Sequence, residues 1–234
     1  NQNDAAKYSQ YKTEYDSVYA SFTDEQIKAY QEGLSNVVDE FHMTVYNKDV
    51  IDTIYSWQKE THGNQPMKLR WVASKVEKNM KMTFPETWDD NQIMSFIENV
   101  SKSQVGITTD DYLKIRALNQ AYMERIGVNS IELYRGTDGK LGKELLEIVK
   151  KLKQTKRTNT VRIKDFNLCG YTSNKNIAIN FIENGEGIGI TKNIDIHKIF
   201  IHKDLFGRYG NFKHLKELEY VIFGEDAAID LSQI

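Results

Sequence analysis

Apolar residues recur at helical spacing through the first half of the chain, and the spacing shortens after Gly127. Residues 23–26 have the form of a capping box, in which Thr23 accepts a backbone N–H and Gln26 reaches back to the cap. The apolar positions that follow form a single stripe, as on one face of an amphipathic helix. These positions are Ile27, Tyr30, Leu34, Val37, Val38, Phe41 and Val45.

Three more helices are expected, over residues 50–59, 88–100 and 108–127. The last is the best defined, because Thr108 can cap its first turn and Asp110 and Asp111 suit the positive end of the helix dipole. Gly127 is well placed to end this helix in a left-handed conformation.

After Gly127, short runs rich in β-branched and aromatic residues indicate strands over 128–134, 161–163, 188–190, 194–201 and 218–223. Helical spacing returns over 141–152 and 177–182. Helices followed mainly by strands predict an α+β fold rather than an alternating parallel sheet. We expect one domain, with a helical subregion over about 20–127 and a β-rich core over about 128–226.

Composition narrows the class of protein. The 234 residues are 40% apolar and 27% charged, as in soluble globular domains, and the net charge of −2 shows no basic excess. Cys169 is the only cysteine, which excludes an internal disulfide. No apolar run approaches the roughly 20 residues of a membrane helix. The chain begins at Asn1 without a methionine, so a signal peptide or a longer parent protein could have preceded it.

The sequence contains no pattern typical of a metal site, and its glycine-rich stretch does not match a nucleotide-binding motif. The five histidines lack the spacing of metal ligands, and His197 and His202, which flank a strand, are expected at the surface. The glycines of 185–189 match neither a dinucleotide fingerprint nor a P-loop and indicate a turn. We therefore expect no metal cofactor.

Three polar sites stand at the edges of apolar runs: Arg135 after Leu133 and Tyr134, Ser173 after Tyr171, and Glu217 and Glu219 before residues 220–223. An arginine can grip a phosphate with two parallel N–H bonds, and the following Gly136 allows a ligand close to the backbone. Two carboxylates two residues apart on a strand face the same way, which suits acid–base work.

Each site taken alone also fits a structural role. Arg135 would then be a solvated side chain after a strand. Thr172 or Ser173 would be the N-cap of a helix, a role that still leaves a hydroxyl for a ligand. Glu217 and Glu219 would be a solvated pair close to Lys213, His214 and Lys216.

Together, in this order, the three sites resemble the Arg-Ser-Glu group of mono-ADP-ribosyltransferases, enzymes that use NAD as a substrate. The likeness covers about residues 131–223. The family commonly has an aromatic residue, any residue and then Ser-Thr-Ser, whereas this chain keeps only the first serine, Ser173, before Asn174 and Lys175. Ala178 and Phe181 resemble the small and aromatic positions that follow. The Glu-x-Glu pattern resembles the branch that modifies arginine.

The resemblance implies a core of the ADP-ribosyltransferase type, a mixed β-sandwich with the helical region packed on it, and NAD as co-substrate. Glu219 would stabilise the oxocarbenium-like ribose, and Glu217 would orient the acceptor and help remove its proton. Arg135 would hold the NAD phosphates, and Ser173 would steady Glu219 and the nicotinamide ribose. The residues expected to bind NAD are Tyr134, Arg135, Gly136, Ser173, Phe181 and Glu219.

Residues 205–212 combine glycines with aromatic residues and suit a mobile loop that meets a protein partner. In such transferases this stretch leads into substrate recognition, so Tyr209, Phe212 and Glu217 are the candidate contacts with the acceptor. The alternative is that the two aromatic side chains fill the core beneath a turn.

The resemblance thus favours a toxin or effector that transfers ADP-ribose to an arginine of a target protein. The sequence leaves the localisation open; secretion, or delivery into a target cell with action in its cytosol, would suit such a protein. Other acceptors stay open: a small molecule, water in an NAD glycohydrolase, or nucleic acid, which the basic run over 150–157 would suit. Two further alternatives are a catalytically inactive domain of the same fold and an unrelated α+β binding module.

Overall fold

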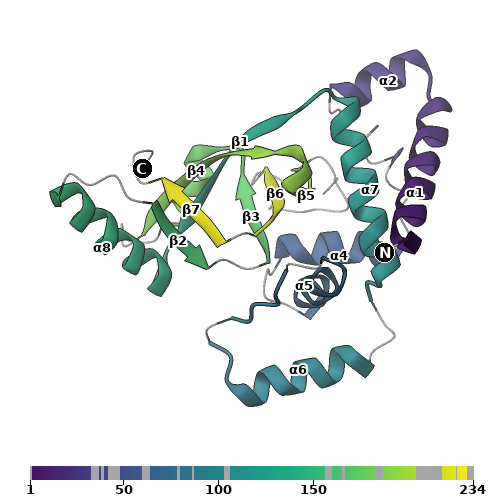
Figure 1. Ribbon diagram of the computed structural model, residues 1–234. Helices are drawn as coiled ribbons and strands as arrows, with labels where there is room; N and C mark the ends of the chain where they lie inside the picture. The colour runs from purple at the N-terminus through teal and green to yellow at the C-terminus, as the bar shows by residue number, and fades with distance from the viewer. Residues whose placement is uncertain are drawn as a thin grey trace.

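The structure of the protein is a computed structural model, which describes residues 2–32, 37, 40–41, 48–59, 64–77, 80–85, 87–102, 106–155, 160–164, 167–182, 187–203, 218–224 and 226–230. Figure 1 shows a central sheet with helices around it. Helices α1 and α7 run side by side at one end, α4 and α5 lie beneath the sheet, and α8 lies at the opposite end.

The described residues of the first half of the chain are mainly helical. Their helices are α1 (Gln2–Ala20), α2 (Asp24–Gln31), α4 (Lys48–Lys59), α5 (Asn64–Val76), α6 (Asp90–Lys102) and α7 (Thr109–Arg125). Both predicted capping boxes are confirmed, at Thr23 with Gln26 and at Thr108 with Asp111. Gly127 has the predicted left-handed backbone, with φ 71°.

The main sheet has five strands in the order β4-β1-β3-β6-β5, with every neighbouring pair antiparallel. The strands are β1 (Ser130–Thr137), β3 (Leu168–Thr172), β4 (Ile188–Asp195), β5 (Ile199–Ile201) and β6 (Glu219–Phe223). A separate antiparallel pair joins β2 (Thr160–Lys164) to β7 (Asp226–Asp230). Helix α8 (Gly139–Thr155) packs on β4, and the short α9 (Lys175–Asn180) packs on β1 and β3.

The predicted α+β class is therefore confirmed. The described strands pair antiparallel throughout, in the main sheet and in the separate β2–β7 pair, whereas the resemblance implied a mixed β-sandwich. Helix α2 ends at Gln31, well before the end of the apolar stripe drawn from Ile27 to Val45. Helices α1 and α5 were not predicted: α1 has no broad apolar face, and it packs through tyrosines at positions 11, 15 and 19.

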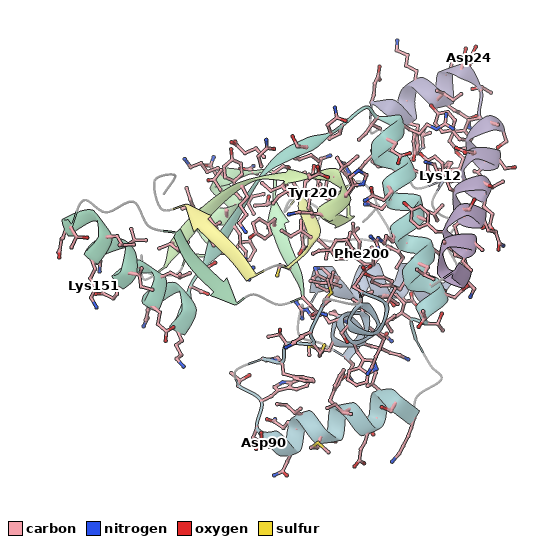
Figure 2. The ribbon with its side chains drawn as sticks, in the orientation of Figure 1. Lys12, Asp24, Asp90, Lys151, Phe200 and Tyr220 are labelled. Atoms are coloured by element: carbon pink, nitrogen blue, oxygen red, sulfur yellow. The ribbon has the colours of Figure 1, made fainter. Side chains whose placement is uncertain are left out.

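Helix α7 is the centre of the core, because it contacts α1, α5 and β5 and most of its residues are buried. Its Tyr112 ring stacks on Phe200 of β5, with ring centroids 4.8 Å apart. Figure 2 shows Phe200 in the space between the sheet and the helices. The fold is thus held around one helix that is buried on several sides.

The surface position expected for His202 is wrong. His202 is buried, and its ring lies between Tyr122 of α7 and Tyr220 of β6, with centroids 5.1 Å and 4.8 Å away. His197 is exposed, as expected. Spacing along the chain did not reveal that His202, which directly follows β5, packs against α7. Among the described residues, no helix is both long and apolar enough to cross a membrane.

Candidate functional site

The sequence-predicted residues of β1, β3 and β6 meet in one row across the middle of the sheet. Tyr134 of β1 pairs with Thr172 of β3, and Thr172 pairs with Glu219 of β6. Neighbouring strands lie about 5 Å apart, so this row spans about 10 Å. Arg135 and Ser173 each follow a residue of the row. Segments far apart in the sequence are therefore neighbours at one place in the fold.

Ser173 and Glu219 are linked through the backbone. The Ser173 N–H donates to the carbonyl oxygen of Leu218, 3.3 Å away, directly before Glu219. The side chain of Ser173 is half-buried. Ser173 is not a helix cap, and neither is Thr172, because the N-cap of α9 is Asn174, whose side chain accepts the Asn176 N–H at 3.0 Å. The capping alternative is therefore wrong, and Ser173 lies between the end of β3 and that cap.

Leu218 has a left-handed backbone with φ 48°, an uncommon conformation for a residue other than glycine. The extended geometry of β6 begins at Glu219 and does not continue back through Leu218. The prediction that Glu217 and Glu219 face the same way rested on an extended strand through both, and that premise is wrong at Leu218. Glu217 itself lies outside the described residues, as do Tyr209 and Phe212.

The carboxylate of Glu219 is held from below the sheet by a tryptophan. The indole Nε1–H of Trp57 in α4 donates to Glu219 Oε1 at 2.9 Å. Trp57 is fully buried, with 0% of its surface exposed, and Glu219 is half-buried. Gly170 of β3 makes room for this arrangement, because a Cβ atom there would overlap with Glu219 Oε1.

Arg70 of α5 lies on the same side. Its guanidinium carbon is 4.7 Å from the centroid of the Trp57 ring, and its Nε donates to the carbonyl oxygen of Leu168 at 3.1 Å. Asn167 returns a bond to the carbonyl oxygen of Arg70 at 2.8 Å. Only 2% of Arg70 is exposed, so this cation is part of the core and not a solvated surface charge.

Arg135 leaves the opposite face of the sheet from Glu219. Directly paired residues share a face and successive residues alternate, so Tyr134, Thr172 and Glu219 project together and Arg135 projects with Tyr171. The guanidinium carbon of Arg135 lies 5.6 Å from the centroid of the Tyr171 ring. Strand pairing thus brings the backbones of Arg135 and Glu219 close together, but their side chains lie on opposite faces of the sheet.

The junction between β1 and β3 is short. Within the described residues these strands pair at one position, Tyr134 with Thr172, whereas β1 pairs with β4 at eight. Arg135 stands one residue beyond the single pair. Gly136 follows it, and a Cβ atom there would overlap with the carbonyl oxygen of Ala178 in α9. The glycine therefore allows α9 to sit directly on β1.

Phe181 follows α9 and is one of the few large apolar side chains in the described part of the chain that are exposed, at 50%. A Cβ atom on Gly136 would come within 3.0 Å of its Cβ, so Phe181 lies beside Gly136. Tyr134 is half-buried, and its hydroxyl donates to the carboxylate of Glu132 on the same strand. This hydrogen bond raises the pKa of Tyr134.

Sequence reasoning missed Trp57 and Arg70, although α4 itself was expected. Nothing in the local pattern marks either residue, because a tryptophan and an arginine on helices are common in cores and on surfaces alike. Only the packing of α4 and α5 beneath β3 and β6 brings them to Glu219. Among the described residues, no group of three or more His, Cys, Asp or Glu side chains could hold a metal ion.

Comparisons with known proteins add no assignment: no protein-family model matches the chain, and no curated protein or solved structure matches it significantly. The function is therefore inferred from the residues and their geometry.

Proposed function

We propose that the protein is a mono-ADP-ribosyltransferase that moves ADP-ribose from NAD to an arginine of a target protein and releases nicotinamide, and that it acts as a toxin or effector. The observation that carries this proposal is the row in which Tyr134, Thr172 and Glu219 pair across β1, β3 and β6, with Arg135 and Ser173 adjoining it. Arg135, Ser173 and Glu219, which follow one another along the chain in the Arg-Ser-Glu order, are thereby neighbours in the sheet.

The chemistry fits a single carboxylate at the ribose. The C–N bond between the ribose and nicotinamide breaks with its electron pair leaving on nicotinamide, and positive charge develops on the sugar, as in glycoside cleavage. In this proposal Glu219 stabilises that charge and bonds a ribose hydroxyl. A guanidinium nitrogen of the acceptor then bonds to the sugar carbon and loses a proton, which Glu217 helps to remove.

The remaining roles follow from position. Ser173 donates a backbone hydrogen bond to the carbonyl oxygen of Leu218, directly before Glu219, and in this proposal it steadies the carboxylate and the nicotinamide ribose. Phe181 and Gly136 line the approach over β1, with Tyr134 beside them. Arg135 binds the phosphates. Because Arg135 and Glu219 leave opposite faces, the proposal requires the dinucleotide to cross the sheet at the short junction of β1 with β3. This requirement makes Arg135 the most demanding part of the proposal.

The test is nicotinamide release from NAD, measured with and without the arginine mimic agmatine. We expect release by the wild type that rises with agmatine, and a loss on the order of 100-fold or more in Glu219→Gln, since one electrostatic contact at the reacting centre is typically worth that much. Glu147→Gln is the matched control, because it makes the same change on the exposed face of α8.

Different results separate the alternatives. Release without an agmatine effect keeps the NAD chemistry and replaces the arginine acceptor with another. Loss of transfer but not of hydrolysis in Glu217→Ala supports the division of roles, and equal loss of both removes it. No release from folded wild-type protein overturns the proposed function.

A further inference from the structure

A carboxylate that stabilises a transition state must be held where the charge develops. A misplacement of about 1 Å can cost on the order of 100-fold in rate. Glu219 begins β6, and its side chain has several rotatable bonds, so the strand alone does not fix the carboxylate. The hydrogen bond from Trp57 restrains the carboxylate, because it ties Glu219 Oε1 to a side chain that is itself fully buried.

The indole of Trp57 in α4 is held by a buried cation, Arg70, on the neighbouring helix α5. The guanidinium of Arg70 lies 4.7 Å from the centre of the indole ring, within the range of a cation–π contact. Arg70 is in turn tied to the beginning of β3 through the Leu168 carbonyl oxygen, at 3.1 Å. The indole is therefore fixed against β3, which Ser173 directly follows, and against β6, which begins with Glu219.

The choice of acceptor is informative. A buried indole N–H needs a hydrogen-bond partner, and a backbone carbonyl would satisfy it. Here the partner is a carboxylate whose side chain the sheet does not need, because β6 pairs with its neighbours through its backbone. The buried N–H donor of Trp57, on a helix far away in the sequence, is thus directed at the candidate catalytic carboxylate of Glu219.

We infer that Trp57 is a positioning residue for Glu219, which orients the carboxylate toward the nicotinamide ribose and favours its charged form, and that Arg70 fixes the indole for this role. The inference rests on the proposed function. A hydrogen bond donated to a carboxylate stabilises the ionised state, so losing it makes the carboxylate take up a proton at higher pH.

The first experiment compares Trp57→Phe with Trp71→Phe in nicotinamide release. Phenylalanine keeps a ring and removes the N–H donor. Trp71 is a matched control because it lies on α5 and contacts Lys75 and Phe96, away from Glu219. We expect kcat to fall about 10- to 100-fold in Trp57→Phe, with KM for NAD within about threefold of the wild type. We also expect the acid limb of its pH–rate profile to move to higher pH.

The second experiment does not depend on activity. The chain has three tryptophans, so a ¹⁵N-labelled sample gives three indole N–H signals, and the signal missing in Trp57→Phe identifies Trp57. We expect Glu219→Gln to shift that signal and to leave those of Trp71 and Trp88 in place. The same signal should move with pH as the carboxylate of Glu219 takes up its proton. The two spectra that are compared, of the wild type and of Glu219→Gln, both come from protein that keeps the Trp57 indole ring, and Trp57→Phe serves only to identify the signal.

The outcomes separate the two proposals. An active wild type with equal kcat in Trp57→Phe and Trp71→Phe overturns the positioning role and leaves the proposed function standing. An unchanged Trp57 indole signal in Glu219→Gln overturns it as well, whatever the activity. A wild type that releases no nicotinamide overturns the proposed function, and the positioning role with it. Loss of kcat specific to Trp57→Phe, together with the shifted signal, establishes the inference.

Discussion

Two junctions between helices and the sheet bury polar side chains, and they use them differently. Where α7 meets β5, Asn119 donates to the Ile199 carbonyl oxygen at 2.9 Å and accepts the His202 N–H at 2.7 Å, so both partners are backbone groups. Where α4 meets β6, Trp57 donates to the side chain of Glu219. The first junction completes the sheet, and the second orients a group that the sheet does not require.

The difference gives a criterion for deciding whether a buried polar side chain stabilises the fold or serves a functional site. Backbone groups at the end of a strand must be satisfied for the fold to form, so a side chain that binds them stabilises the fold. Tyr220, labelled on the sheet in Figure 2, packs edge-to-face against His202 and belongs to the structural junction, although it directly follows Glu219. Changes at the α7 junction should therefore lower stability, and changes at the α4 junction should lower activity.

The largest expected effect is at Asn119. Replacing it with leucine leaves the buried His202 N–H without this acceptor, whereas the Ile199 carbonyl oxygen loses one donor and keeps Gln120 Nε2 at 3.3 Å. An unsatisfied buried group costs about 1–3 kcal/mol and a lost hydrogen bond about 1 kcal/mol, so Asn119→Leu should lower the free energy of unfolding by about 3 kcal/mol. Urea denaturation measures this loss. Asn91→Leu on the exposed face of α6 is the control and should change it by less than about 0.5 kcal/mol. Equal effects would remove the structural role of the α7 junction.

The next effect is at Gly136. A methyl group there would overlap with the backbone of Ala178, so α9 must move, and we expect Gly136→Ala to lower stability by about 2 kcal/mol. Gly189 pairs directly with Gly136, and a Cβ atom there would meet only Ile182 Cδ1, at 3.9 Å. Thermal denaturation measures both variants, and Gly189→Ala should be neutral or slightly stabilising. If both variants behave alike, the close packing of α9 on β1 is wrong.

Alkaline pH probes the structural side through a buried tyrosine. Burial is the largest cause that raises the pKa of Tyr15, whose hydroxyl bonds Tyr30 at 2.7 Å. A folded-state pKa above the unfolded value of about 10 means stability that is fully present below that pH and lost as the pH rises above it. Tyr15→Phe should lower stability by about 1 kcal/mol at neutral pH and reduce the loss between about pH 10 and 12. Burial also raises the pKa of Tyr112, so part of that loss should remain.

The smallest change in stability, and the one most specific to the site, is expected at Gly170. A methyl group there would overlap with the carboxylate of Glu219, the end of a flexible side chain, so stability should change by less than about 1 kcal/mol. The carboxylate would be displaced and its hydrogen bond from Trp57 distorted but kept, so NAD turnover should fall about 10-fold. Gly189→Ala serves again as the control in both measurements. Unchanged turnover in Gly170→Ala would show that the orientation of Glu219 does not limit the reaction.

Local patterns predicted much of the fold. The capping boxes at Thr23 and Thr108 depend on residues three apart, so they could be identified from sequence and are confirmed. Helix α6 was expected over residues 88–100 and covers Asp90–Lys102. None of its residues is buried, and the ring of Phe96 contacts the rings of Trp71, Phe84 and Trp88. Helix α7 is buried on several sides. A stripe predicts that a helix forms, but not how deeply the rest of the chain covers it.

The candidate site divides in the same way. Arg135, Ser173 and Glu219 could be identified from their order along the chain, and the pairing of β1, β3 and β6 brings their positions together. The sequence could not show that Arg135 leaves the opposite face from Glu219, because a face depends on strand register. It also could not show the left-handed backbone of Leu218, which interrupts the alternation assumed for Glu217 and Glu219.

The sequence by itself determined most of the helices and strands, the helix caps at Thr23 and Thr108, and which polar residues stand at strand edges, because these depend on neighbours a few residues away. It did not reveal helices α1 and α5. Only the tertiary structure decided that Trp57 and Arg70 meet Glu219, that His202 is buried, and that glycines at 136 and 170 admit α9 and a carboxylate. Those contacts join residues that are up to 162 positions apart. No local pattern encodes them, since they arise from how helices and strands pack.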